Sequence, residues 1–374
     1  IPMCAFERSE KGMIFFMNIG IIGLGFMGGS LAKSLSKLED VNKIIAYDLN
    51  LDSLKKAKDD HIISDYTTSI DNNFSDLDIV FLCTPVKFIR FYAEQLENIV
   101  KKDCIITDIG STKKEVLKDV ENLNINFIGG HPMIGSERSG YATSIDYLFE
   151  NSFYILTKKN NEKQINILQS LIKSIGAIPV IIDQEKHDYI TAVISHVPHV
   201  VAAALVNLVK NLDDKNETMK MLAAGGFKDT TRIASSDPIM WQHICMTNKD
   251  EVSQVLDILI NNLQSFKNTL DKYDEGAIFD YFNDAKIYRD SFITKKINGQ
   301  VLPYINVKIR DESGAISRTI SLIADKNISI KNIGIINNRE QNDGVLNIVF
   351  ATYEDLNKAS NILKENNYDI TKSE

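Results

Sequence analysis

The pattern of apolar and polar positions divides the chain into three regions that predict different secondary structure. In the first region, short β-branched runs alternate with helical segments, which is typical of a mostly parallel sheet covered by helices on both faces. From Glu185 to about Lys295 the pattern is helical, with almost no strand signal. After the turn signal Asn298-Gly299, the predicted order is strand, helix, strand, strand, helix, strand, which is the order of a ferredoxin-like βαββαβ unit. We therefore expect domains over residues 17–183, 184–298 and 302–374.

The predicted strands are short and apolar. In the first region they are Asn18–Ile22, Lys43–Tyr47, Asp78–Cys83, Cys104–Thr107, Asn126–Ile128, Phe153–Leu156 and Val180–Ile182. In the third region they are Tyr304–Ile309, Ser329–Ile336, Val345–Ala351 and Tyr368–Ile370, with helices over Gly314–Asp325 and Asp355–Glu365.

The helical region contains a segment that is apolar nearly all the way round. It runs from Val200 to Val206 inside a longer predicted helix, Glu185–Asn211. A helix of this kind is buried, either in a core or in a subunit interface. Pro198 lies just before the segment; it lacks an N–H and crowds the carbonyl group of Ile194, so we expect a kink there. The pattern therefore favours a helical second domain that makes contacts between subunits.

Composition excludes several classes of protein. The 374 residues are 44% hydrophobic and 25% charged, which excludes extensive disorder and low-complexity fibres. The net charge of −8 argues against a general nucleic-acid binder, because no excess of positive charge attracts phosphate groups. A site for a small anion would therefore need isolated arginine or lysine residues nearby. No apolar run reaches the roughly 18 to 20 residues that a membrane span needs.

The four cysteines are scattered and form no CxxC pair: they are Cys4, Cys83, Cys104 and Cys245. This spacing predicts neither a metal cluster nor a redox motif, and it fits a reducing, cytoplasmic location. The sequence has no HExxH or comparable ligand cluster, so we expect no metal. Residues 1–16 lack the features of a secretory signal. Met17 directly precedes the first strand. Residues 1–16 are therefore either an extension before a native start at Met17 or an ordinary ordered N-terminal segment.

A glycine-rich turn, Gly23-Leu24-Gly25-Phe26-Met27-Gly28, follows the first predicted strand. A helix comes next, and Asp48 ends the second strand, which is the context that makes this pattern a dinucleotide site. Gly23 permits the tight turn, Gly25 lets the backbone approach the pyrophosphate, and Gly28 lets the helix pack close to the strand. Asp48 can accept hydrogen bonds from a ribose 2′-hydroxyl and would repel a 2′-phosphate. We therefore expect a Rossmann-type domain that prefers NAD to NADP.

Polar residues follow three later strands. Thr84 and Pro85 would lie beside the cofactor, although a plain strand-ending turn is an equal alternative. Ser111 follows the next strand, and His131 stands between Gly130 and Pro132 after another. Because ligands bind outside the carboxyl ends of strands in open α/β sheets, Ser111 and His131 could approach the nicotinamide. A histidine there can act as a general base, since its pKa lies near neutrality.

Taken together, these motifs resemble those of the prephenate dehydrogenase family. The motifs stand in order at 23–28, 108–111, 130–132, 195–199, 225–232 and 237–241. The resemblance covers Asn18 to about Lys295, and the joint occurrence in this order is highly specific. It implies a homodimer that uses NAD to convert prephenate to 4-hydroxyphenylpyruvate by oxidative decarboxylation, in tyrosine biosynthesis.

The resemblance also implies roles for individual residues. His131 would take the proton from the C4 hydroxyl as a hydride leaves C4 for NAD, and Ser111 would hydrogen-bond both the hydroxyl and His131. Ser195 and His199, which share a helix face, would contact the substrate. Arg232 would grip a substrate carboxylate with two hydrogen bonds.

Several of these assignments have plainer alternatives. Lys228, Asp229 and Glu137 would form an ionic network around Arg232 and govern entry, or they are solvated surface charges. Trp241 would reach the site of the neighbouring subunit, or it packs in the core. The alternative for His199 is a core polar group whose hydrogen bonds are satisfied, and for His196 that reading is favoured.

The third region resembles an ACT domain, a common amino-acid sensor. Asp311, Ser313 and Gly314 lie in the turn where that family binds its effector, although the family usually has proline where Ser313 stands. L-tyrosine, the end product, is the corresponding feedback inhibitor. The alternative is a purely structural dimerisation module.

Three other functions stay open. Arogenate dehydrogenase acts on a substrate with an amine in place of the keto group, and no motif distinguishes it. A β-hydroxyacid dehydrogenase shares the glycine-rich turn but should use a catalytic lysine in the second domain, for which the sequence offers no convincing equivalent. The third is a non-enzymatic regulator that binds NAD and an amino acid.

Overall fold

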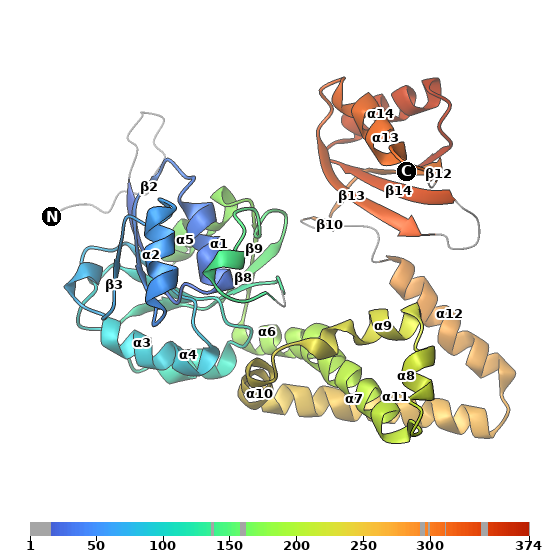
Figure 1. The fold of residues 1–374 in the computed structure, drawn as a ribbon, viewed down its shortest axis with the longest axis horizontal. Coiled ribbons are helices and arrows are strands. Elements are labelled where there is room, and N and C mark those ends of the chain that lie inside the picture. Colours follow the sequence, from blue (N-terminus) through green and yellow to red (C-terminus); the bar gives the residue numbers. More distant parts are fainter. Residues whose placement is uncertain are drawn as a thin grey trace. The chain divides into compact units, whose positions relative to one another are not determined.

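The structure is a computed structural model that describes residues 16–135, 138–157, 162–291, 296–297, 300–310, 312–337 and 343–373. The chain separates into two compact units, Ile1–Leu263 and Gln264–Glu374 (Figure 1). Helix α11 (Lys249–Asp271) passes from the first into the second. Residues 1–15, including the stretch before Met17 whose origin is open, lie outside the described residues.

A six-stranded parallel sheet forms the centre of the first unit. Its order is β3-β2-β1-β4-β5-β6, so the chain reverses its direction of travel across the sheet between β1 and β4. Ligands of such sheets bind at the carboxyl ends of the strands, at this switch point. The strands are β1 (Met17–Ile22), β2 (Val41–Tyr47), β3 (Asp65–Thr67), β4 (Ile79–Leu82), β5 (Ile105–Asp108) and β6 (Asn126–Ile128).

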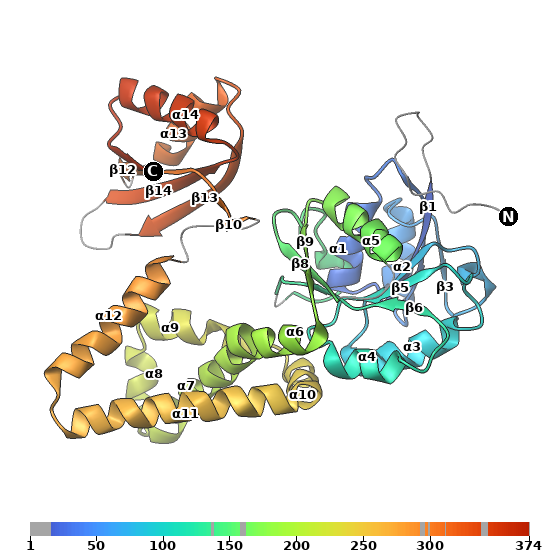
Figure 2. The ribbon, with the colours of Figure 1, turned by 180° about the vertical axis from the view of Figure 1, so that it is seen from behind.

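Both faces of this sheet are buried, because strand side chains alternate between two apolar cores. In β1, Ile19 and Ile21 face one core, and Ile22 faces the other. The first core is closed by α1 (Phe26–Leu35), α2 (Leu51–Asp59) and α5 (Glu162–Ser174), and the second by α3 (Ile89–Leu96) and α4 (Lys114–Val120) (Figure 2). The predicted Rossmann-type α/β architecture is confirmed.

A three-stranded sheet extends this domain. Strand β7 (Gly130–Pro132) pairs antiparallel with β8 (Phe153–Thr157), and β8 pairs parallel with β9 (Ile178–Ile182). The sequence predicted β8 and β9 but neither β7 nor β3, because β7 contains a glycine and a proline and β3 begins with an aspartate, and these residue types are depleted in strands. Strand β7 contacts β5 and carries His131 to the carboxyl edge of the main sheet.

The helical region begins at α6 (Gln184–Thr191), and the helix continues through a π-helical turn, Ala192–His196, into α7 (Val197–Leu212). The expected disturbance at Pro198 therefore takes the form of a π-turn directly before it. Helix α7 packs on α11 through Val197 and Val255. The remaining elements are α8 (Thr218–Leu222), α9 (Gly225–Thr231), the 3-10 turn η5 (Arg232–Ser235) and α10 (Pro238–Thr247).

By length and composition alone, the helical run Gln184–Leu212 could cross a membrane. The expectation that no segment is long enough is thus corrected: it counted uninterrupted apolar residues, whereas average hydropathy tolerates the polar Ser195, His196 and His199. Core helices of soluble proteins pass the same test when they are mostly buried, whereas 22% of this window is buried within the single chain.

The second unit contains α12 (Glu275–Ser291), a short β10–β11 pair (Lys296–Ile297 and Gln300–Val301) and a βαββαβ region. Its elements are β12 (Tyr304–Arg310), α13 (Ala315–Ala324), β13 (Ile330–Asn337), β14 (Asp343–Phe350), α14 (Tyr353–Glu365) and β15 (Ile370–Lys372). The antiparallel order β13-β14-β12-β15 is that of a ferredoxin-like sheet, as predicted. The sheet and its two helices enclose a separate apolar core.

Candidate active site

The glycine-rich turn has the geometry that the sequence predicted for a phosphate-binding loop. Gly23 has a φ of +96°, and a Cβ atom there would lie 2.6 Å from the carbonyl oxygen of Cys83. A Cβ atom on Gly28 would lie 2.0 Å from the carbonyl oxygen of Gly23. A Cβ atom on Gly25 would meet no atom within 4 Å. Gly23 and Gly28 are thus required by the turn itself, whereas Gly25 faces open space.

Helix α1 begins directly after Gly25, and no side chain caps its N-terminus. Its first N–H groups and its partial positive charge can therefore bind an anion. Phe26 is buried and Met27 half-buried, so the helix start is anchored in the core. The open space at Gly25 and the uncapped helix fit a dinucleotide pyrophosphate.

Two more side chains lie at this turn. Asp48, just beyond β2, accepts hydrogen bonds from the backbone N–H of Leu24 and, at 2.7 Å, of Asn50. The side chain of Thr84 reaches to 3.2 Å from the Cβ position of Gly23. Among the described residues, the buried Thr84 Oγ1 has no hydrogen-bond partner, which is costly unless a ligand supplies one. Pro85 is exposed beside it and starts the 3-10 turn η2 (Val86–Phe88).

The strand register places His131 at the same edge of the sheet. Ile22 pairs with Leu82, and Leu82 pairs with Asp108, so the ends of β1, β4 and β5 are aligned. Asp108 Oδ1 accepts a hydrogen bond from the N–H of Gly130 at 3.1 Å, which holds β7 against β5. His131, the next residue, is half-buried.

The ring of His131 is held by a second histidine that sequence reasoning missed. His131 Nδ1 lies 2.9 Å from His187 Nε2. His187 is fully buried in α6, and its Nδ1 lies 2.6 Å from Asp188 Oδ1. Asp188 also accepts hydrogen bonds from the N–H groups of Lys113, at 2.8 Å, and Lys114, at 2.9 Å, at the start of α4. A carboxylate, two imidazoles and a helix N-terminus thus form one chain of contacts.

A buried ion pair lies beneath these residues. Lys113 Nζ and Asp108 Oδ2 are paired, and both side chains are fully buried. The carboxylate oxygens of Asp108 also accept hydrogen bonds from the N–H groups of Gly110, at 2.8 Å, and Gly130. Burial lowers the pKa of Lys113, although Asp108 opposes that effect. This pair fixes the β5–α4 loop, which contains Ser111.

Ser111 is half-buried in that loop. Its neighbour Thr112 hydrogen-bonds Thr247 of α10 at 3.0 Å, so the loop is tied to the helical region. Within the described residues, His131 Nδ1 contacts His187. A hydrogen bond between Ser111 and His131 stays a prediction.

The π-turn and α7 bring a third group of polar side chains to this region. Ser195 is half-buried in the π-turn, a feature frequent at functional sites. His199 stacks on Trp241, with ring centroids 3.8 Å apart. His196 is buried, and its Nδ1 lies 3.0 Å from Asn248 Nδ2; Asn248 also donates to the carbonyl oxygen of Asp188. His196 is therefore a satisfied core histidine.

Comparison with known proteins decides the family. Residues 31–181 match the nucleotide-binding domain of prephenate dehydrogenase, and residues 183–284 match its dimerization domain. The chain is 35% identical, over 92% of its length and 95% of the relative's, to prephenate dehydrogenase of Bacillus subtilis. The chain belongs to the prephenate dehydrogenase family.

Solved structures of the prephenate dehydrogenase family and of a relative agree with this fold. A prephenate dehydrogenase from A. aeolicus, in complex with hydroxyphenyl propionate and NAD+, matches 76% of this chain and 100% of its own at 37% identity, with a TM-score of 0.71. An arogenate dehydrogenase from Synechocystis matches 74% of this chain and 100% of its own at 26% identity, with a TM-score of 0.67.

The other sites expected from the resemblance lie in the helical region, in the second unit or outside the described residues. Arg232, in η5, and Lys228, in α9, are exposed, and both elements pack against α7. Trp241 packs on His199 of its own chain, and a reach towards another subunit stays a prediction. Ser313 and Gly314 are described at the start of α13, whereas Glu137 and Asp311 lie outside the described residues.

Electrostatics favour a neutral His131. Burial lowers the pKa of His131 well below its ordinary range, and the nearby His187, Lys113 and His196 lower it further. Burial likewise lowers the pKa of His196 to about 4. At neutral pH the ring of His131 is therefore uncharged and can accept a proton.

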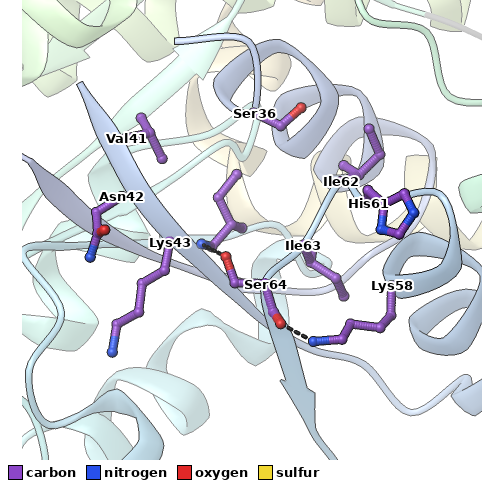
Figure 3. Close-up of a pocket in the computed structure, with 10 residues that line it drawn as sticks. Ser36, Val41, Asn42, Lys43, Lys58, His61, Ile62, Ile63 and Ser64 are labelled. Atoms are coloured by element: carbon purple, nitrogen blue, oxygen red, sulfur yellow. Dashed lines mark hydrogen bonds between the residues drawn. The ribbon is translucent and has the colours of Figure 1, made fainter. Parts of the chain in front are cut away.

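A hollow of about 330 Å³ in the same domain is unrelated to this site (Figure 3). It is lined by Val41, Lys43 and Ser64, at the start of β2 and between α2 and β3, with Lys58 and His61 from the end of α2. Asp48 follows the opposite end of β2. Ligands of this fold bind at the carboxyl ends of the strands, whereas the hollow lies at the amino end of β2.

Proposed function

We propose that this chain catalyses the NAD-dependent oxidative decarboxylation of prephenate to 4-hydroxyphenylpyruvate, a reaction of tyrosine biosynthesis. The observation that carries the proposal is the setting of His131: a neutral imidazole at the carboxyl edge of a dinucleotide-binding sheet, held through Nδ1. This arrangement leaves Nε2 to face a substrate. Membership of the prephenate dehydrogenase family supports the choice of substrate.

In the proposed reaction, NAD supplies the acceptor for the hydride that leaves C4. His131 takes the proton of the C4 hydroxyl, so that the C–O bond can become a carbonyl. The bond from C1 to its carboxylate then breaks, its electrons pass through the ring to that oxygen, and the ring becomes aromatic. His131 can return its proton to the resulting phenolate. Ser111 would orient the hydroxyl by a hydrogen bond.

The residues that would hold NAD follow from the turn. Gly23, Gly25 and Gly28 shape the loop, and the start of α1 at Phe26 and Met27 presents its N–H groups to the pyrophosphate. Asp48 would face the adenine ribose and select against a 2′-phosphate. The unpartnered hydroxyl of Thr84, with Pro85 beside it, would contact the bound dinucleotide.

The residues that would hold prephenate come mainly from the helical region. Ser195 and His199 lie on the helix that also carries His187, and Trp241 braces His199. Arg232 would bind a carboxylate, with Lys228 and Glu137 around the entrance. Arg232 and Lys228 would supply positive charge to a dianionic substrate in a protein whose net charge is −8.

A four-way assay tests the proposal: prephenate or arogenate, each with NAD or NADP. We expect the highest kcat/KM with prephenate and NAD. Arogenate dehydrogenase is the second candidate, because the Synechocystis enzyme shares the fold and 26% of its residues. Tight NAD binding without NADH formation from either substrate would overturn the proposal and favour a regulator.

We propose that the functional unit is a homodimer assembled through the helical region. The match of residues 183–284 to a dimerization domain supports this. Large apolar side chains are exposed there in the single chain, including Leu208 at 53%, Leu212 at 62% and Ile260 at 59%. Exposed apolar surface of this extent marks an interaction site. Analytical ultracentrifugation should give twice the mass of the chain, and Leu208→Glu should shift the protein towards monomer.

We propose that residues 302–374 form an ACT domain that senses L-tyrosine. A cavity of about 560 Å³ lies where β12 meets α13, and its charged lining residues are Lys308, Arg310, Arg318, Glu312 and Asp369, three basic and two acidic. Gly314 begins α13 with a φ of +82°, and Arg318 forms an ion pair with Glu312 across the turn. Positive charge and a tight turn at a helix start suit the carboxylate of an amino acid.

The ACT proposal is tested by tyrosine inhibition. Gly314→Val strains the turn, because its φ is unfavourable for a branched side chain, so it should raise the inhibitory tyrosine concentration without changing uninhibited turnover. Deletion of residues after Gly299 should abolish the inhibition. Unchanged inhibition in both proteins would show that the module is not the sensor.

The three-domain division at residues 17–183, 184–298 and 302–374 is also a proposal. It is supported by the family matches, which meet between residues 181 and 183. A cytoplasmic location is likewise proposed, since the described Cys83, Cys104 and Cys245 are free thiols, as a reducing compartment would leave them.

A further inference from the structure

We infer that His187 is a positioning residue that, with Asp188, holds His131 in the one tautomer able to act as a base through Nε2. The inference rests on the proposed function, because it assigns His131 the proton of the substrate hydroxyl. Its evidence is the geometry of three adjacent side chains on two elements, β7 and α6.

The first step concerns Asp188. Its Oδ1 accepts a backbone hydrogen bond from Lys113 at 2.8 Å, and its Oδ2 accepts one from Lys114 at 2.9 Å. These N–H groups belong to the start of α4, where the helix dipole favours negative charge. Both oxygens of Asp188 are thus hydrogen-bond acceptors.

The second step concerns His187. Because Asp188 Oδ1 is an acceptor, the contact of 2.6 Å to His187 Nδ1 requires that this nitrogen carries the proton. Its Nε2 lies 2.9 Å from His131 Nδ1, so one of these two nitrogens carries the proton of the contact and the other the lone pair. Because the fully buried ring already carries its proton on Nδ1, we assign the lone pair to His187 Nε2.

The third step concerns His131. A lone pair on His187 Nε2, 2.9 Å from His131 Nδ1, requires that His131 donates through Nδ1–H. The neutral ring then has no proton on Nε2. A general base needs this tautomer, since the other presents an N–H to the substrate and cannot accept its proton.

The same contacts act during the reaction. When the O–H bond of the substrate breaks and the Nε2–H bond of His131 forms, the ring becomes an imidazolium. Its Nδ1–H points at the lone pair of His187, which disperses the new charge towards Asp188. The other charged and titratable groups around His131 are Lys113, paired with Asp108, and His196, bonded to Asn248. All are already engaged, so His187 is the acceptor placed for this role.

The experiment compares two substitutions at one position. His187→Leu fills similar volume without an acceptor, whereas His187→Gln keeps an oxygen that can accept from His131 Nδ1–H. His61→Asn is the matched control, because His61 is exposed, lies beyond α2, and has a φ of 58° that asparagine tolerates. Asp188 is not substituted, since its removal would also release the start of α4.

The readouts are steady-state turnover of prephenate and ¹⁵N spectra of the ring nitrogens, which are tractable because the chain has six histidines. We expect the wild-type His131 in the Nδ1–H form. In His187→Leu, His131 should lose its preference for the Nδ1–H form, and kcat should fall about 100-fold with little change in KM. In His187→Gln, kcat should stay within about tenfold of the wild-type value. His61→Asn should match wild type in both readouts.

Two results would overturn the inference: an Nε2–H tautomer in wild-type His131, or a kcat for His187→Leu within twofold of wild type. The tautomer is measured without substrate, so it stands if His187→Leu does not fold. It also separates this inference from the proposed function. A chain with the Nδ1–H form that turns over neither prephenate nor arogenate would refute the function and leave the tautomer assignment in place.

Discussion

Trp241 lies nearly flat against His199, with the ring planes 26° apart and the centroids separated by 3.8 Å. His196 meets the same indole edge-on at 5.9 Å. The stack joins α10 to α7 beside the π-turn, so it sets the direction in which His199 faces.

Loss of this stack should weaken substrate binding more than it slows chemistry. A stacked aromatic pair contributes about 1 kcal/mol, so Trp241→Ala should raise the KM for prephenate about five- to tenfold, and Trp241→Phe should restore most of it. Because Trp241 is the only tryptophan, its fluorescence in the wild type should change when prephenate binds. Unchanged KM in Trp241→Ala would show that His199 does not depend on the indole.

Substitution by alanine at two glycines of the turn should affect different properties, stability at Gly28 and NAD binding at Gly25. A Cβ atom on Gly28 would lie 2.0 Å from a backbone oxygen, so Gly28→Ala should lower the melting temperature. A Cβ atom on Gly25 meets nothing in the protein, so Gly25→Ala should leave the melting temperature unchanged and weaken NAD binding. Thermal unfolding with and without NAD measures both effects. Equal NAD affinity in Gly25→Ala and wild type would argue against the pyrophosphate position.

The buried pair of Lys113 and Asp108 should be important for stability. Lys113→Met leaves the buried carboxylate with two backbone donors only, and such a loss typically costs about 3–5 kcal/mol in the free energy of unfolding. Lys114→Met is the control, because Lys114 is 49% exposed and forms a surface pair with Glu251. That change should cost less than about 1 kcal/mol. Urea unfolding that gives similar midpoints for the two variants would contradict the prediction.

Acid should destabilise the folded chain through His196. Its pKa is lowered from 6.5 to about 4, chiefly by burial. Between these values the unfolded chain binds a proton that the folded chain does not, so the free energy of unfolding falls as pH drops, by up to about 3 kcal/mol. His196→Asn keeps an acceptor for Asn248 but cannot titrate. Its stability should therefore fall less between pH 6.5 and pH 4, and parallel stability curves would refute this assignment.

Local signals in the sequence were enough for the nucleotide site and the sheet. The glycine turn, Asp48 and the strand ends occur within short windows, and Gly23 and Gly28 answer a backbone requirement that the residue type reveals. The βαββαβ order was equally readable, because its strands are long enough to show a pattern. Strands β3 and β7 were missed because neither contains adjacent large apolar residues such as those that reveal the equally short β6.

The support of His131 could not be predicted in the same way. His187 lies 56 residues further along the chain, and the pair meets only when α6 packs against the strand edge. In the sequence, Lys186-His187-Asp188 reads as an ordinary polar first turn of a helix. The one available signal was an apolar helix region that begins with a histidine and an aspartate at adjacent positions.

The most direct test of the account is the rate of NADH formation in a single turnover of prephenate by His131→Asn. If His131 is the base, the variant should bind NAD and prephenate with near wild-type affinity and form NADH about 10³-fold more slowly. A rate within tenfold of wild type would contradict the central role of His131.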